Sequence, residues 1–260
     1  MKRQVGQNDI SLRRWLRGRC CSYRLVVDAG YVGHVPEFWD LPRRFAQGEG
    51  ELIHDRRNQL RILPMGEEEV VVKRFALPNL LNRFVYALLR SSKAKRSFLY
   101  ARLLRADGLG SPRPVAYLEE RLLGICLLRS YYVSLRSRLP YTYADVAGEA
   151  LPRPLMEQFL RAVGRFTARF HMAGMLHKDY NNGNLLLGLD AGGEAQVELV
   201  DLNRIRFHHV GLKEGCQNMV ERLDYKPWQL ALLAEGYARE RGVDVEQCLA
   251  WIRDGKKTQK

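Results

Sequence analysis

The sequence contains no apolar run that approaches the ~20 residues needed to span a bilayer. The basic opening, Met1 to Arg19, lacks the apolar core of a signal peptide. Cysteines are also few, five in 260 residues, with no C-x-x-C pair and no spacing typical of a disulfide framework. The adjacent Cys20 and Cys21 leave metal binding or lipidation open, but we expect reduced thiols in a protein of the cytoplasm.

Acidic residues are absent from one long stretch, because no Asp or Glu occurs between Val70 and Ala106. The whole chain has 42 Lys and Arg against 29 Asp and Glu, a net charge of +13. Such an excess favours polyanionic partners, and an anionic membrane surface or a phosphorylated substrate fits it. The sequence has no RNA-binding motif with interleaved aromatics, no zinc spacing and no helix-turn-helix signature, so we expect no nucleic-acid partner.

The clearest motif is the octapeptide His177–Asn184, which follows the pattern H-x-D-x-x-x-x-N. Two short apolar runs, Leu185–Leu187 and Val197–Val200, flank the turn-forming Asp190–Gly193 and predict a β-hairpin. Asp201 comes directly after the second run. The hairpin would therefore bring the oxygen-bearing side chains of the octapeptide and of Asp201 together at one end.

This order of residues is typical of a protein-kinase-like phosphoryl-transfer site. Asp179 would accept or orient the proton of the attacking hydroxyl, and Asn184 with Asp201 would bind Mg²⁺ through oxygen atoms. Lys73, on a strand upstream, would hold the nucleotide phosphates, although a lysine at a strand end is usually only solvated. We expect His177 to be structural, with its imidazole hydrogen-bonded to the loop backbone.

The first half of the sequence predicts mainly strands. The glycine-rich loop G-x-G-x-x-G of protein kinases is missing, and the polar turn Asp55–Asn58 stands in its place. Arg57 and Asn58 are candidates for binding nucleotide phosphates there, and an exposed hairpin tip is an equally open alternative. Periodicity predicts six strands, all in the N-lobe, at Tyr23–Val27, Glu51–His54, Gln59–Leu63, Val70–Phe75, Val115–Tyr117 and Leu122–Tyr132. It also predicts helices at Pro36–Phe45 and Ser91–Ala106.

The second half predicts mainly helices. The first begins at Pro154 and ends near Gly174, and further helices are predicted at Gln217–Leu223 and Pro227–Arg241. The polar tail Asp254–Lys260 is expected to be mobile. Together the patterns predict an α+β, two-lobed protein-kinase-like fold in one domain, residues 1–260. Its antiparallel β N-lobe would cover about residues 20–133 and its reduced, mainly helical C-lobe residues 134–260, joined through Ser130 to Ser137.

At these motifs the sequence resembles the lipopolysaccharide kinase family, the Kdo and heptose kinases, and most of all its shorter members in Bacteroidetes-type bacteria. The resemblance implies ATP and Mg²⁺ as cofactors and a sugar hydroxyl of the lipopolysaccharide core, Kdo or heptose, as acceptor. It also implies work in the cytoplasm, peripherally at the inner face of the inner membrane, on a lipid A–core glycolipid. The matching segments, all between residues 51 and 218, are Val72–Lys73, Lys93–Ser97, Pro112–Tyr117, His177–Asn184 and Val200–Arg204.

Several departures argue against a typical protein kinase. Asn181 stands where Ser/Thr protein kinases usually have lysine, and Asn203 replaces the glycine of D-F-G. No A-P-E motif follows, and only 59 residues remain after Asp201. A protein Ser/Thr/Tyr kinase with a reduced C-lobe nevertheless stays an alternative function.

One departure bears on activity itself. Kinases pair the strand lysine with a helix glutamate, whose place falls near Ser97 in this sequence, and no acid occurs there. Either another group such as Asp201 holds Lys73, or catalysis is weak, or the protein is a membrane-associated pseudokinase. The joint presence of Asp179, Asn184 and Asp201 favours an active kinase.

Overall fold

The computed structural model describes residues 9–15, 20–55, 58–76 and 91–257. The chain divides into two compact units, each with its own core. Unit 1 comprises residues 1–103 and 112–136, and unit 2 comprises residues 104–111 and 137–260. Among the described residues, no helix is long and apolar enough to cross a membrane.

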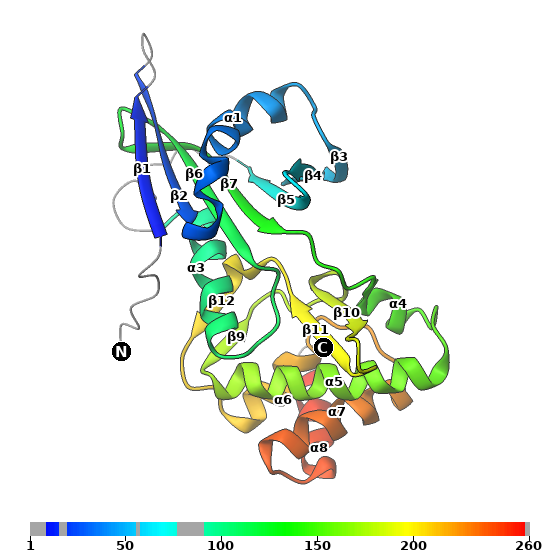
Figure 1. Ribbon diagram of the computed structural model, residues 1–260. Helices are drawn as coiled ribbons and strands as arrows, with labels where there is room; N and C mark the ends of the chain where they lie inside the picture. Colours follow the sequence, from blue (N-terminus) through cyan, green and yellow to red (C-terminus); the bar gives the residue numbers. More distant parts are fainter. Residues whose placement is uncertain (1–8, 16–19, 56–57, 77–90, 258–260) are drawn as a thin grey trace. The chain divides into compact units, whose positions relative to one another are not determined.

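Unit 1 is built on one antiparallel sheet in which the order of strands in space differs from their order in the sequence (Figure 1). The strands, from one edge to the other, are β1 (Asp9–Trp15), β2 (Cys21–Asp28), β6 (Pro114–Leu122), β7 (Cys126–Leu135), β5 (Glu68–Phe75), β4 (Gln59–Met65) and β3 (Glu51–Asp55). The predicted α+β class, with an antiparallel sheet in the N-terminal half, is confirmed.

A helix covers part of each face of this sheet, because side chains of a strand alternate between the faces. Leu25 of β2 belongs to the core beneath α1 (Val35–Ala46), whereas its neighbour Val26 packs with Phe98 of α3 (Lys93–Ala106). The last three residues of α3 belong to unit 2. On α3, the side chains of Ala94, Phe98, Ala101 and Leu104 are fully buried.

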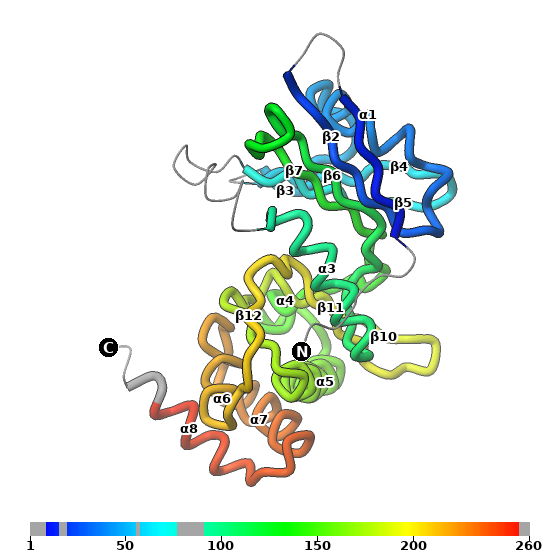
Figure 2. Tube along the Cα trace, turned by 90° about the vertical axis from the view of Figure 1, so that its left-hand side faces the viewer, coloured from blue at the N-terminus to red at the C-terminus, as the bar shows by residue number. Residues whose placement is uncertain are grey.

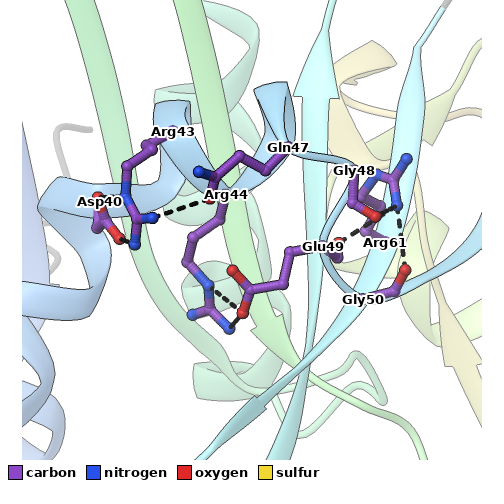
Figure 3. A network of polar contacts seen from close by, with 8 residues as sticks. All are labelled: Asp40, Arg43, Arg44, Gln47, Gly48, Glu49, Gly50 and Arg61. Carbon is purple, nitrogen blue, oxygen red and sulfur yellow. Dashed lines mark hydrogen bonds and ion pairs between the residues drawn. The ribbon is translucent and has the colours of Figure 1, made fainter.

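A polar network fixes the chain between α1 and β3 (Figure 3). The guanidinium of Arg44 donates to the carboxylate of Glu49 at 2.6 Å, and Arg61 of β4 donates to the backbone carbonyls of Gly48 and Gly50 at 2.7 and 3.0 Å. Gly50 has a φ of +81°, a conformation that favours glycine. The network therefore sets where β3 begins and supports the β3–β4 hairpin.

Unit 2 is mainly helical (Figure 2). Its longest helix, α5, crosses α7 closely because glycines face each other: a Cβ added to Gly164 would lie 2.3 Å from a carbonyl of α7, and one added to Gly236 would lie 2.2 Å from a carbonyl of α5. The helices are α4 (Tyr143–Ala147), α5 (Arg153–Met172), α6 (Leu212–Val220), α7 (Pro227–Arg241) and α8 (Val245–Lys257).

Two small antiparallel sheets complete unit 2 and carry the motif residues. In the first, β10 (Leu185–Leu189) lies between β11 (Ala195–Leu199) and β8 (Tyr141–Thr142). In the second, β9 (Met175–His177) pairs with β12 (Ile205–Phe207). The predicted hairpin at residues 185–200 is confirmed.

Some predictions for unit 1 were wrong. The basic opening contains the edge strand β1, which the sequence hid because its Arg13 and Arg14 interrupt any apolar alternation. The unit therefore has seven strands, one more than the six predicted ranges. The predicted strand Leu122–Tyr132 is broken by a turn at residues 123–125, and β7 continues to Leu135, through most of the predicted connection Ser130 to Ser137.

The end of the chain was also predicted wrongly. Helix α6 begins at Leu212, five residues before the predicted start. Residues 245–257 form α8, where we expected a polar tail from Asp254 onward. Cys248 and Ile252, one helical turn apart, are buried, and this spacing drives the helix to dock.

Candidate active site

The hairpin of β10 and β11 brings the motif residues together in unit 2. Asn184 ends a short 3₁₀ helix directly before β10, and Asp201 follows β11 after one residue. The backbone N–H of Val200 donates to the carbonyl of Asn184 at 2.9 Å, and the side chain of Asn184 donates to the carbonyl of Asp179 at 2.7 Å. Asp179, Asn184 and Asp201 thus converge at one end of the hairpin.

His177 joins the two loops of this site. Its side chain is fully buried, its Nδ1 accepts from the backbone N–H of Asp179 at 3.1 Å, and its Nε2 donates to the carbonyl of Asp201 at 3.1 Å. Burial lowers the pKa of His177 below its ordinary value, which keeps the ring neutral with one donor and one acceptor nitrogen. The predicted structural role of His177, through the loop backbone, is confirmed.

Asp201 adopts a backbone conformation that L-amino acids rarely use. Its φ of 55° and ψ of 44° lie in the left-handed region, which costs roughly 1–2 kcal/mol for a residue with a side chain. Aspartate and asparagine tolerate this region better than other non-glycine residues. The hydrogen bond from His177 and a further one from the Asn203 amide to Oδ1 of Asp201 hold the residue in place.

The oxygen atoms at the site suit a magnesium ion. The Asn184 amide nitrogen is committed to the Asp179 carbonyl, so its Oδ1 is the atom that can take a metal, beside the carboxylate of Asp201. Among the described residues, no three or more His, Cys, Asp or Glu side chains gather to hold a metal by themselves. One amide and one carboxylate oxygen fit Mg²⁺, which usually completes its shell with water and substrate phosphates.

Two arginines flank the carboxylate of Asp179, and the sequence reasoning gave neither of them a role. Arg222 contacts Oδ1 at 3.2 Å and Arg204 contacts Oδ2 at 3.3 Å. Both guanidinium groups are about half exposed, at 51% and 49%. Because exposed ion pairs are weak, at roughly 0–1 kcal/mol, either arginine can exchange Asp179 for an incoming anion at small cost.

The chain after α6 docks on the catalytic loop and brings Arg222 there. Asn181 and Arg222 form an isolated parallel bridge between their backbones. The side chain of Asn182 donates to the carboxylate of Asp224 at 2.7 Å and accepts from its backbone N–H at 3.0 Å. The sequence carries no signal for Arg222, because forty residues and several elements separate it from the loop, whereas Arg204 lies within a segment already noted for its similarity.

Buried polar groups anchor the loop to the helices. The hydroxyl of Thr167 on α5 donates to the Val163 carbonyl at 2.7 Å, so the hydroxyl of Tyr180, at 2.6 Å, is the donor to Thr167. Complete burial raises the pKa of Tyr180. From α6, the Asn218 amide donates to the carbonyl of His177 at 3.2 Å. The loop geometry is therefore fixed from two helices of its own unit.

The remaining candidates belong to unit 1. Lys73 lies on β5 opposite Tyr132 of β7 and is half-buried, with its Nζ 5.4 Å from the centroid of the Phe75 ring. Asn58 accepts a hydrogen bond from the backbone N–H of Ala76 at 3.2 Å, which ties the β3–β4 turn to the end of β5. Arg57 lies outside the described residues. Nucleotide binding by these residues stays a prediction.

The helix position that carries a glutamate in kinases is occupied here by Ser97, an uncharged residue. Ser97 on α3 is buried, at 2% exposure, among Ala94 and Phe98. Helix α3 contains no acidic residue. Helix α3 therefore offers no carboxylate to Lys73, in agreement with the sequence.

Three comparisons relate parts of the chain to known proteins. The model of the lipopolysaccharide kinase (Kdo/WaaP) family matches residues 80–223. The chain is 38% identical over 115 residues to 3-deoxy-D-manno-octulosonic acid kinase of Xanthomonas axonopodis pv. citri, a match that covers 42% of this chain and 41% of that protein. The enzyme of the same name from Xanthomonas oryzae pv. oryzae is 37% identical over the same length. The chain spans about two fifths of the length of these curated relatives.

The fold is similar to that of a solved structure, WaaP in complex with acyl carrier protein. The TM-score is 0.56 at 18% sequence identity, and the match covers 91% of this chain and all of the other. The similarity confirms the predicted protein-kinase-like fold.

Proposed function

Because the chain belongs to the lipopolysaccharide kinase (Kdo/WaaP) family, we propose that it transfers the γ-phosphate of ATP to a sugar hydroxyl of the lipopolysaccharide core. The observation that carries the proposal is the convergence of Asp179, Asn184 and Asp201, with His177 bonded to both loops. Phosphoryl transfer asks a protein mainly for positioning and for stabilisation of charge, and this arrangement supplies both.

Each residue of the site has a role in this proposal. Asp179 accepts or orients the proton of the attacking hydroxyl. Asn184 and Asp201 hold Mg²⁺, which when bound neutralises charge on the nucleotide phosphates. Lys73, with Arg57 and Asn58, is proposed to bind the phosphates of ATP; this assignment follows kinases in general and rests on sequence position.

The arginines beside Asp179 favour Kdo over heptose as the acceptor. The curated relatives are named for 3-deoxy-D-manno-octulosonic acid, a sugar that carries a carboxylate. A guanidinium binds a carboxylate through paired, charge-assisted hydrogen bonds. When the acceptor carboxylate takes over Arg204 and Arg222, it also releases Asp179 to receive the proton. A heptose without an acidic group would make no such exchange.

The acceptor is proposed to be part of a lipid A–core glycolipid at the inner face of the inner membrane, with the protein peripheral on the cytoplasmic side. The net charge of +13 suits a phosphorylated, anionic glycolipid.

The test is transfer of labelled γ-phosphate to purified core glycolipid by Asp179→Ala and by Asp254→Ala, an exposed matched control on α8. We expect transfer to be lost in Asp179→Ala and unchanged in the control, with equal thermal stability in both. Undiminished transfer by Asp179→Ala would refute the proposed mechanism. Mass spectrometry of the product identifies the sugar, and phosphate on a heptose would refute the choice of Kdo.

Arg222→Ala separates recognition of the acceptor from binding of ATP. We expect the KM for the glycolipid to rise by about tenfold, since one paired, charge-assisted contact is worth roughly 1.5–3 kcal/mol. The KM for ATP should stay within a factor of about two. An equal rise in both constants would mean that Arg222 only supports the loop.

One observation favours a second candidate function, a pseudokinase that binds membranes. No acidic residue of α3 is available to pair with Lys73. A thermal-shift titration with Mg·ATP distinguishes the two functions, because a pseudokinase of this kind would show no shift and no transfer.

A further inference from the structure

Several large apolar side chains are exposed to solvent at one end of the sheet of unit 1. Trp15 and Leu123 are each 62% exposed, Ile125 is 59% exposed and Leu122 is 39% exposed. Strand pairing places them together, because Trp15 lies opposite Ser22 on β2 and the neighbouring residue of β2 lies opposite Leu122 on β6. Figure 1 shows the β6–β7 turn beside the end of β1. We call Trp15, Leu122, Leu123 and Ile125 the apolar tip.

The backbone holds the apolar tip in this exposed position. Leu123 has a φ of 51°, in the left-handed region that a leucine rarely adopts, and Gly124 follows at 73°. The backbone N–H of Leu123 donates to the carbonyl of Cys20 at 2.6 Å, so the β6–β7 turn is bonded to the start of β2. A Cβ on Gly124 would lie 3.5 Å from the Trp15 ring. The two strand ends thus form one surface, and a strained turn directs Leu123 outward.

Arginines surround the apolar tip, and the nearby carboxylates are already paired. Glu119 bonds Arg121 at 2.9 Å, and Glu120 lies 3.9 Å from Arg129. Arg13 and Arg14 are exposed and have no carboxylate partner among the described residues. The arginines of these strand ends are Arg13, Arg14, Arg24, Arg121 and Arg129.

We propose that the apolar tip inserts into an anionic lipid bilayer and docks the protein there. Exposed Trp and Leu side chains with a basic rim are the features that bind the interface of anionic membranes, where apolar side chains enter the acyl boundary and arginines meet the lipid phosphates. The inference rests on the proposed function in one respect: the apolar tip would be the surface through which the enzyme reaches a membrane-borne acceptor.

The test uses the full chain and vesicles of one part phosphatidylglycerol to three parts phosphatidylcholine, with sedimentation to measure partitioning. The tip variant is Leu123→Asn with Ile125→Asn, chosen because asparagine tolerates a positive φ. The matched control is Ile53→Asn with Leu189→Asn, two side chains that are each 45% exposed elsewhere. We expect the tip variant to lose about tenfold or more in partitioning, and the control to change by less than about twofold.

Two further readouts make the result specific. Brominated lipids should quench the fluorescence of the wild-type protein more than that of Trp15→Phe. Transfer to a water-soluble core oligosaccharide should survive in the tip variant, while transfer to vesicle-embedded glycolipid falls. Equal partitioning of tip and control variants, or no binding of the wild type, would overturn the inference. Because the partitioning assay needs no catalytic turnover, the inference of membrane docking can hold even if the proposed kinase activity is refuted.

Discussion

Replacement of His177 by phenylalanine should weaken both the fold and the catalysis of unit 2. A phenyl ring fills the fully buried space of the imidazole without leaving a large cavity. The substitution therefore removes mainly the two hydrogen bonds of the imidazole. Each is worth roughly 0.5–1.5 kcal/mol, so the free energy of unfolding should fall by about 1–3 kcal/mol. For a chain of this size that corresponds to a decrease in Tm of roughly 3–10 °C.

The effect on catalysis should be larger than the effect on stability. His177 fixes the Asp179 backbone and restrains Asp201 in its left-handed conformation, so its loss displaces the proposed base and a proposed metal ligand relative to each other. A displacement of about 1 Å at reacting groups can cost about 100-fold in rate. We therefore expect kcat for phosphoryl transfer to fall by about 30- to 300-fold.

The assay is transfer of labelled phosphate together with thermal denaturation, on His177→Phe and on His209→Phe. His209 is exposed and is the control for the loss of an imidazole. The control should keep kcat within about a factor of two and Tm within about 1 °C, as surface substitutions usually do. If His177→Phe behaved like the control in both measurements, the assigned role of the imidazole would be refuted.

Two further predictions concern the stability of unit 2. Burial lowers the pKa of His171 to about 4. Below about pH 6.5 the ring is therefore protonated in the unfolded chain while it stays neutral in the folded chain. The free energy of unfolding should therefore be highest above about pH 6.5 and should fall by about 2 kcal/mol by about pH 5. Urea titrations at both pH values should show a smaller decrease for His171→Gln. Gly110→Ala should destabilise the protein by about 1–3 kcal/mol or more, because its Cβ would lie 1.9 Å from the Val197 carbonyl. Gly211→Ala, whose Cβ meets nothing within 4 Å, is the control in the same titration, and equal stabilities would contradict the steric reason.

Local patterns in the sequence predicted the centre of the candidate site well. The octapeptide, the hairpin and Asp201 lie within 25 residues, so apolar runs and a turn between them suffice to bring their ends together. Helices α5 and α7 were equally clear, because α5 buries one side of a periodic sequence and a proline marks the start of α7. The protein-kinase-like class followed from the order of these elements along the chain.

Elements stabilised by distant partners were the ones that the sequence hid. Strand β1 is basic and mostly exposed, and it forms because β2 offers an unpaired edge. Helix α8 ends in a polar, basic run, and contacts with α6 hold it: its Cys248 thiol lies 3.0 Å from that of Cys216, and the Gln217 amide donates to the Trp251 carbonyl at 3.1 Å. Such contacts join residues more than 30 positions apart, and no local window can show them.

By itself, the sequence determined which groups we propose for phosphoryl transfer, since the identities and spacing of Asp179, Asn184 and Asp201 are local properties of the chain. Only the tertiary structure decided how those groups are held and what surrounds them. The neutral His177 that joins the two loops and the Arg222 beside Asp179 depend on packing between distant segments. Hydrogen bonds and ion pairs act over a few ångströms in space, whatever the separation of their partners in the sequence.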